Sequence, residues 1–265
     1  MTATLGFVGG GRMGEALIAG ALRSGRSADS IVVVEASAAR CQEIHERYRV
    51  VTAPEATTLR GVSTVVLAVK PQQIAEVCRE IADHLTPGTL VVSVAAGTTI
   101  AALSAALPGH RIVRVMPNTP ALIGRGMSAV CAGSQVSDDD LTDLMALLGA
   151  VGDVVRVEEA QMDAVTAVSG SGPAYAFYLA EAMESAAESL GLSAEVARRL
   201  VAQTLAGAGE LLATSQRNPA DLRADVTSPG GTTQAAIESL DRDEVAAAIQ
   251  RAVVAAAKRS EELSN

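Results

Sequence analysis

The 265-residue sequence is poor in the side chains that carry most acid–base, metal and redox chemistry. It contains three histidines, three cysteines and two lysines, Lys70 and Lys258. The cysteines Cys41, Cys78 and Cys131 are odd in number and far apart, which predicts neither a disulfide framework nor a metal cluster. We therefore expect no metal site. We expect the three thiols to be buried or incidental, in the reducing environment of a cytoplasmic protein.

Other absences exclude whole classes of function. No uninterrupted apolar stretch approaches the ~20 residues that a membrane-spanning helix needs. No basic segment followed by an apolar block indicates a secretory signal. A net charge of −9 and 2% aromatic residues argue against nucleic acid, which requires a basic surface and stacking side chains. The remaining expectation is a cytoplasmic protein that binds a small molecule.

Glycine is abundant near the N-terminus. An apolar strand expected over residues 5–8 is followed by G-x-G-x-x-G and then by an apolar-periodic helix. In this setting Gly9 permits the turn, Gly11 lets a pyrophosphate approach the backbone, and Gly14 allows close packing of helix and strand. The pattern predicts a dinucleotide site. Its expected cofactor-binding residues are Gly9, Gly10, Gly11, Arg12, Met13 and Gly14.

The alternation of elements predicts the fold class. Strands are expected over residues 5–8, 31–34, 50–51, 64–69, 90–94, 111–116, 127–131 and 154–157, with helices between them. Such alternation indicates a doubly wound, mostly parallel sheet of Rossmann type. Beyond Gln161 strand signals disappear and the sequence is alanine-rich and helical. We expect an α/β NAD(P)-binding domain over residues 1–160 and an all-α domain over residues 161–265.

Several candidate ligand residues follow strands that end at one edge of this sheet. In open α/β sheets, ligands bind at the carboxyl ends of the strands. Glu35 ends the second strand, where an acid can accept a hydrogen bond from a ribose 2′-hydroxyl. On spacing alone, Lys70 fits a cofactor ligand and a surface residue equally well. The further candidates for cofactor binding at this edge are Ala68, Val69, Lys70, Pro71, Ala95, Gly97 and Asn118.

A second motif, SPGGTT, begins at Ser228. Gly230 and Gly231 remove side chains that would keep a ligand from the backbone. Their N–H groups, with those of Thr232 and Thr233, lie where a helix begins and have no intrahelical partners. Such a helix start binds a small anion such as a carboxylate, and the hydroxyl groups add donors that can pass a proton. A lone SPGG segment is, however, more often only a capped helix start with a tight turn.

Taken together, these features resemble the pyrroline-5-carboxylate reductase family over nearly all of the chain. The resemblance rests on FVGGGRMGEALIAG, LAVKPQQ, SVAAGTTI, RVMPNTPALIG, DAVTAVSGSGPAYAFYLAEAM and DVTSPGGTT. The last two blocks together are nearly diagnostic. The resemblance implies NADPH or NADH as cofactor, a helical C-terminal domain that interleaves with that of a second subunit, and, in many members, a decamer of five dimers.

The same resemblance implies the substrate, 1-pyrroline-5-carboxylate, which is reduced to L-proline in the last step of proline biosynthesis. The SPGGTT segment then binds the substrate carboxylate. Thr233 matches the family threonine that hydrogen-bonds the ring nitrogen, and Ser228 matches the neighbouring serine, so both are candidate catalytic residues. Asp225 falls where some relatives carry an asparagine near the cofactor. Pro54 and Glu55 depart from the family pattern, in which several members have an asparagine close to the adenosine.

The expected cofactor preference is divided. Glu35 favours NADH, because a carboxylate pairs with the 2′-hydroxyl and repels a 2′-phosphate. Ser37 and Arg40 follow, and the resembling family often uses a serine and an arginine to hold that phosphate. Because Glu35 could turn to solvent or pair with Arg40, we expect both cofactors to work, with NADPH slightly ahead.

Three alternative functions share parts of this pattern. Reductases of other imines share the fold and chemistry but are expected to lack SPGGTT. β-Hydroxyacid dehydrogenases use a lysine in the long helix after the Rossmann domain, and residues 169–190 contain none. A non-catalytic NAD(P)-sensing protein would bind the cofactor without turnover.

Overall fold

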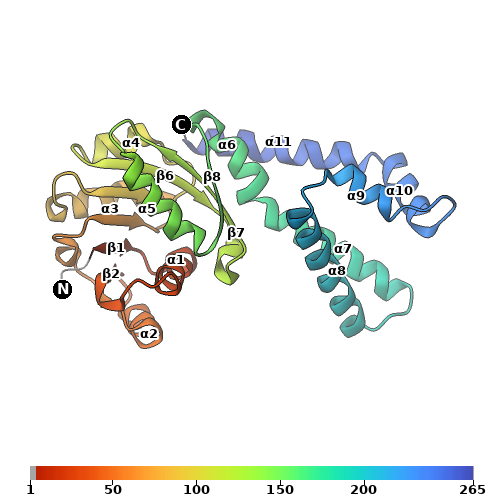
Figure 1. Cartoon of the computed structure of the whole chain (residues 1–265), viewed down its shortest axis with the longest axis horizontal. Coiled ribbons are helices and arrows are strands. Elements are labelled where there is room, and N and C mark those ends of the chain that lie inside the picture. Colours follow the sequence, from red (N-terminus) through yellow and green to blue (C-terminus); the bar gives the residue numbers. More distant parts are fainter. Residues whose placement is uncertain (1–3, 265) are drawn as a thin grey trace. The chain divides into compact units, whose positions relative to one another are not determined.

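The computed structural model of the chain describes residues 4–264, and its N-terminal part is built on one sheet (Figure 1). In chain order the strands are β1 (Leu5–Val8), β2 (Ile31–Val34), β3 (Val51–Ala53), β4 (Thr64–Leu67), β5 (Leu90–Ser93), β6 (Arg111–Pro117), β7 (Gly126–Ala132) and β8 (Gly152–Arg156). Their spatial order is β3-β2-β1-β4-β5-β6-β7-β8. All neighbours are parallel except β6 and β7, which pair antiparallel. The expected mostly parallel, doubly wound sheet is confirmed.

Helices cover both faces of this sheet, which is why its strands are near-continuous runs of valine, isoleucine and leucine. Alternate strand residues such as Phe7 and Val33 pack in one core with α1 (Arg12–Arg23), α2 (Ala38–Tyr48) and α5 (Asp138–Gly149). The intervening residues pack in a second core with α3 (Ile74–Ile81) and α4 (Ile100–Ala106), through Cys78 and Leu103 among others. The helix α3 has a 3₁₀ turn at each end, Pro71–Gln73 and Ala82–His84.

The remaining described chain contains no strand after β8. Its helices are α6 (Met162–Val165), α7 (Gly172–Ser189), α8 (Ala194–Thr214), α9 (Pro219–Asp225), α10 (Thr232–Arg242) and α11 (Val245–Ser264). The C-terminal part is therefore all-α, as expected. A π-helical segment, Thr166–Gly170, separates α6 from α7.

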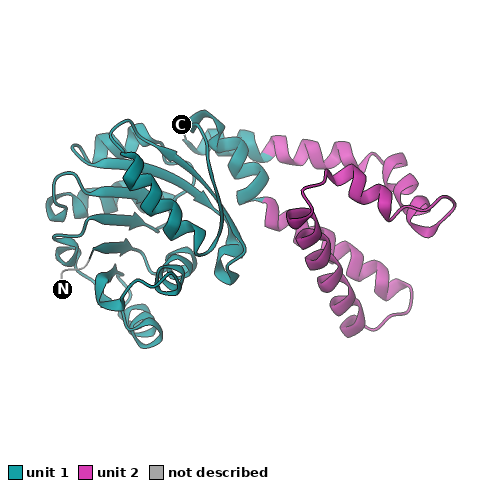
Figure 2. Cartoon of the chain, in the orientation of Figure 1, with its two compact units in different colours: residues 1–171, 256–265 teal, residues 172–255 magenta. Residues whose placement is uncertain are grey.

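The chain divides into two compact units (Figure 2). The first contains the residues up to 171 and those from 256 onward, and the second contains residues 172–255. The helix α6 stays with the sheet because Met162 packs against Ala129 and Cys131 of β7. Asp163 also accepts a hydrogen bond of 2.6 Å from Ser260 near the end of α11. The first change between the two compact units therefore lies between Ser171 and Gly172.

The second unit leaves most of its apolar side chains uncovered. Among its described residues only Ala197 and Val201, both on α8, are buried. Tyr178 of α7 is 76% exposed and Leu190 is 84% exposed. Apolar surface of this extent is unfavourable in water, so these helices require a covering partner.

We expect that partner to be a second copy of the chain. Light scattering at micromolar concentration should give a mass well above that of one chain, through an interface larger than ~2,000 Å². Replacing Tyr178 with aspartate places a charge on the uncovered face and should shift the equilibrium towards the monomer. A wild-type protein that remains monomeric at these concentrations would contradict the expectation.

An ion pair fixes α5 to the sheet. Asp140 lies in the first turn of α5 and forms a capping box with Ser137. Its carboxylate also pairs with Arg111 at the start of β6. Burial alone would raise the pKa of Asp140, but hydrogen bonds from Ser137 and Arg111 outweigh it and hold the pKa below its usual value. The ionised carboxylate therefore stabilises the fold.

Asp140→Ala should lower the free energy of unfolding at pH 7 by about 0.5–2 kcal/mol, the range for loss of a helix-capping side chain. The stabilisation is complete above the ordinary aspartate pKa of 3.8 and disappears as the pH falls through the lower pKa of the folded state. Denaturant titrations at pH 7 and pH 3 should show the deficit shrinking in acid. Asp139→Ala, in the same helical turn but exposed, is the matched control. Equal losses in the two variants would contradict the role of Asp140.

Candidate functional site

The glycine loop between β1 and α1 has the geometry that the motif predicts. Gly9 has a φ of +98°, a left-handed conformation that side chains other than glycine's rarely adopt. A Cβ at Gly14 would lie 2.3 Å from the carbonyl oxygen of Gly9, so only glycine allows this close contact of helix and loop. Gly11 has no heavy atom within 4 Å of the place its Cβ would take. The loop is therefore tight on two sides and open at Gly11.

The open side exposes unpaired backbone donors. Helix α1 begins after Gly11, which provides no side-chain cap. In the described chain, the N–H groups of Arg12, Met13 and Gly14 have no hydrogen-bond acceptor, and the first intrahelical bond is that of Glu15 to Gly11. Unpaired N–H groups at the start of a 12-residue helix favour an anion such as a pyrophosphate. These groups fit a dinucleotide.

A cleft of about 390 Å³ lies beside this loop, at the carboxyl edge of the sheet. Six of the expected cofactor residues line it: Gly9, Gly11, Glu35, Ala68, Val69 and Lys70. The sequence interpretation missed Gln73, Glu76, Val77 and Glu80 of the segment after Lys70. Their spacing of three and four residues on an amphipathic helix next to a strand end was the available signal.

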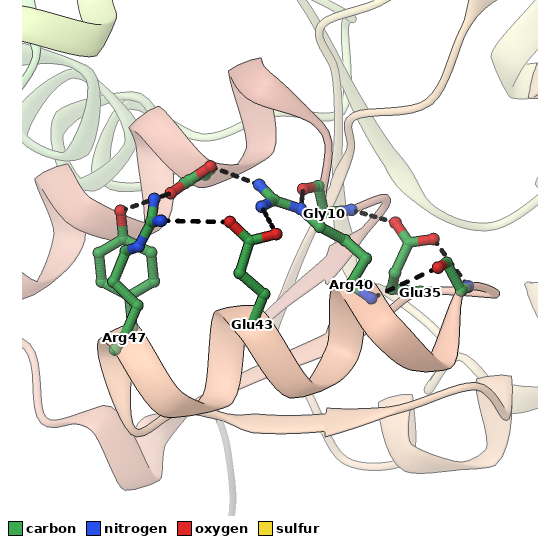
Figure 3. Close-up of polar contacts among 8 residues, drawn as sticks. Gly10, Glu35, Arg40, Glu43 and Arg47 are labelled. Atoms are coloured by element: carbon green, nitrogen blue, oxygen red, sulfur yellow. Dashed lines mark hydrogen bonds and ion pairs between the residues drawn. The ribbon is translucent and has the colours of Figure 1, made fainter.

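Glu35 is fixed by backbone groups (Figure 3). One carboxylate oxygen accepts a hydrogen bond of 2.8 Å from the N–H of Gly10, and the other accepts one of 3.0 Å from the N–H of Ser37. The alternatives expected from the sequence, a turn to solvent or a pair with Arg40, are therefore not adopted. Ser37 instead caps α2 by accepting from the N–H of Arg40.

The Arg40 side chain reaches Gly10 of the same loop, with its guanidinium directed away from Glu35 (Figure 3). Its Nε donates to the carbonyl oxygen of Gly10 over 2.7 Å, and its terminal nitrogens pair with Glu15 and Glu43. Glu15 also accepts hydrogen bonds from Arg47 and from the Tyr48 hydroxyl. Burial alone would raise the pKa of Glu15, but hydrogen bonds from Arg40, Tyr48 and Arg47 lower it, so Glu15 stays ionised.

The other expected cofactor residues are spread over the described units. Pro71 and Gly97 line a second cleft of about 380 Å³ in the sheet unit, together with Leu263, while Ala95 is buried. The side-chain amide of Asn118 donates to Ser169 and accepts from the N–H of Met127, which ties the end of β6 to its neighbours.

Asp225 lies in the helical unit, at the end of α9. Its carboxylate forms an ion pair with Arg217, and the hydrogen bond from Arg217 lowers the pKa of Asp225. Both side chains are exposed, so this pair contributes little to stability.

The SPGGTT segment forms a tight turn before α10. Gly230 has a φ of +71°, and Gly231 is the residue that precedes the helix. The expectation of four unpaired N–H groups is only partly correct. The N–H of Gly230 donates to the Gln234 side chain over 2.7 Å, and the N–H of Gly231 donates to the carbonyl of Ser228 over 3.0 Å. These two N–H groups are therefore not free to bind a ligand.

The donors that remain are the N–H groups of Thr232, Thr233 and Gln234, which have no acceptor in the described chain. A Cβ at Gly231 would lie 2.5 Å from the Ser228 hydroxyl oxygen. A side chain at Gly231 would therefore displace the Ser228 hydroxyl from its place over the turn. An 11-residue helix with three free donors and adjacent hydroxyl groups suits a small carboxylate.

The fold and the glycine loop define an NAD(P)-dependent oxidoreductase with a Rossmann domain. The family model "NADP oxidoreductase coenzyme F420-dependent" matches residues 4–97, and "Pyrroline-5-carboxylate reductase dimerisation" matches residues 159–263. Pyrroline-5-carboxylate reductase of Corynebacterium melassecola is 42% identical, over 98% of both chains. The chain belongs to the pyrroline-5-carboxylate reductase family.

Solved structures agree with this assignment. A pyrroline-5-carboxylate reductase of Coxiella burnetii superposes with a TM-score of 0.93 at 37% identity, over 100% of both chains. The NADP-bound pyrroline carboxylate reductase of Plasmodium falciparum superposes with a TM-score of 0.88 at 29% identity, over 99% of this chain and 98% of the other. Within residues 4–264, no helix is long and apolar enough to cross a membrane.

Gly11 allows a test that separates cofactor binding from folding. Its backbone is extended and the space beside it is empty, so Gly11→Val should fold with nearly the wild-type Tm. The added side chain would fill the path of the pyrophosphate to the α1 N–H groups. Fluorescence titration should show that the affinity for both NADH and NADPH falls at least about tenfold, which is ~1.4 kcal/mol of binding free energy.

The matched control for this variant is Gly149→Val, at the exposed end of α5, where a Cβ also meets nothing within 4 Å. It should bind both cofactors normally. Unchanged cofactor affinity in Gly11→Val would show that the pyrophosphate does not approach this loop.

Proposed function

We propose that this chain reduces 1-pyrroline-5-carboxylate to L-proline with NADPH or NADH, as the last step of proline biosynthesis. The observation that carries the proposal is the SPGGTT turn, whose free N–H groups open α10 in a chain that also has the dinucleotide loop. The family relatives named above, which match over the full length, support the same reaction.

The residues of the turn have different roles in substrate binding. The N–H groups of Thr232 and Thr233 hold the substrate carboxylate, with Gly230 and Gly231 keeping the approach clear. The Thr233 hydroxyl hydrogen-bonds the ring nitrogen and relays a proton to it from water. The Ser228 hydroxyl provides a further hydrogen-bond donor beside Thr233. Only these short polar groups are needed, because a protonated cyclic imine is already an electrophile.

The cofactor, when bound, supplies the hydride. The α1 N–H groups and Gly11 hold its pyrophosphate, Glu35 meets the adenosine ribose, and Lys70 supplies the positive charge in the cleft. Gly97 and Pro71 line the second cleft of the sheet unit, and Ala95 is buried. Position and exclusion of water then account for catalysis, a contribution worth ~7–11 kcal/mol when reactants are well aligned.

The active assembly is a homodimer formed through the helical unit, and a decamer of five such dimers follows the habit of the family. The uncovered apolar side chains of α7 and α8 support self-association. We place the enzyme in the cytoplasm, in keeping with three free, buried cysteines among the described residues.

Thr233→Ala should lower kcat for pyrroline-5-carboxylate by about 10–100-fold, the loss expected for one transition-state hydrogen bond. Cofactor affinity should stay nearly unchanged, because Thr233 belongs to the helical unit and not to the glycine loop. The assay uses pyrroline-5-carboxylate as substrate. It follows the oxidation of NADH or NADPH as the loss of dihydronicotinamide absorbance at about 340 nm.

Thr233→Ser is the matched control and should retain most of the activity, since it keeps the hydroxyl group. An unaltered kcat/KM in Thr233→Ala would refute the role of this residue. A wild-type protein that binds the cofactor but oxidises none in the presence of pyrroline-5-carboxylate would instead favour a non-catalytic NAD(P)-sensing function.

A further inference from the structure

The charges around the cleft beside the glycine loop are unbalanced. Its charged lining consists of Glu35, Glu76 and Glu80 on the acidic side and Lys70 on the basic side. Arg40, the arginine that follows β2, is not part of the lining. A ligand group that brings additional negative charge to this cleft meets three carboxylates and one ammonium group.

We propose that this chain selects NADH over NADPH, and that Glu15 is a positioning residue that holds Arg40 away from the place of a 2′-phosphate. The proposal rests on the proposed function only in that the cleft holds the adenosine end of the cofactor. It replaces the slight preference for NADPH expected from the sequence.

Glu35 is placed to accept a ribose hydroxyl. Both of its carboxylate oxygens are anchored by backbone N–H groups, those of Gly10 and Ser37, so the side chain does not need to reorganise on binding. Each oxygen keeps a further lone pair for a 2′-hydroxyl donor. A 2′-phosphate has no such donor, and its charge of about −1.5 to −2 is repelled by the fixed carboxylate.

Each of the three nitrogens of Arg40 already has a partner, so only two of its five N–H donors remain unassigned. Its Nε is used by the Gly10 carbonyl, and its two terminal nitrogens are used by Glu15 and Glu43. The Arg40 side chain is 22% exposed, so water reaches only part of it. To reach a 2′-phosphate it would have to break these contacts.

Glu15 is the partner that matters most among them. Its side chain is 13% exposed, against 48% for Glu43, so its attraction for Arg40 is less screened by water. Arg47 and the Tyr48 hydroxyl, the latter over 2.9 Å, fix Glu15 from the other side. The guanidinium is therefore held by a carboxylate that is itself anchored.

Equilibrium binding of NADH and NADPH, followed by dihydronicotinamide fluorescence and checked by calorimetry, tests the proposal on the full-length protein. The wild type should bind NADH more tightly. Glu15→Gln should bind NADPH about tenfold more tightly, on the scale of one charge-assisted hydrogen bond gained by the phosphate, with less than about twofold change for NADH.

Two further variants identify the cause. In Glu15→Gln/Arg40→Ala the gain for NADPH should vanish, because the effect requires the released guanidinium. Glu46→Gln removes the same charge from exposed α2 without touching Arg40, and it should leave both affinities unchanged. Thermal melting with each cofactor provides an independent measure of binding.

The proposal is overturned if the wild type binds NADPH more tightly than NADH. It is also overturned if Glu15→Gln shifts both cofactors alike or neither, or if the double variant keeps the gain. Since the measurement is binding and not turnover, a failure of the proposed reaction would appear separately, in the assay with pyrroline-5-carboxylate.

Discussion

The packing of one mostly parallel sheet between two layers of helices is the constraint on which the rest of the structure depends. β1 lies between β2 and β4, with Phe7 in register with Val33 on one side and Val66 on the other. The strand order reverses between β1 and β4, so the loops that follow these two strands diverge there. The divergence opens the cleft that Gly9, Gly11 and the segment from Ala68 to Lys70 line.

Several arginines of this chain hold neighbouring elements together. Arg111 ties α5 to β6, Arg40 and Arg47 tie α2 to α1 through Glu15, and Arg217 pairs with Asp225 on α9. A planar guanidinium with several donors suits such multiple pairing. The backbone N–H groups at the starts of α1 and α10 are the candidate anion sites.

The helical unit carries both an uncovered apolar surface and the turn that is the candidate substrate site. Its α7 and α8 carry apolar side chains that the described residues of the same unit do not cover, and α10 carries the turn with three free backbone donors. The family model for dimerisation spans residues 159–263 and so includes both features.

The sequence by itself determined the features that depend on local patterns. The strands Leu5–Val8 and Ile31–Val34, the glycine loop and the turn before α10 follow from apolar runs, from backbone conformations that favour glycine and from unpaired helix donors. These are short-range effects, so neighbouring residues are enough to specify them.

Only the tertiary structure decided which polar partners meet. Glu35 accepts from the N–H of Gly10 and not from Arg40, and Arg40 pairs with Glu15. Each of these groups had several partners of suitable charge in the sequence. The choice among them depends on which elements the sheet brings within hydrogen-bond distance, and no local pattern contains that information.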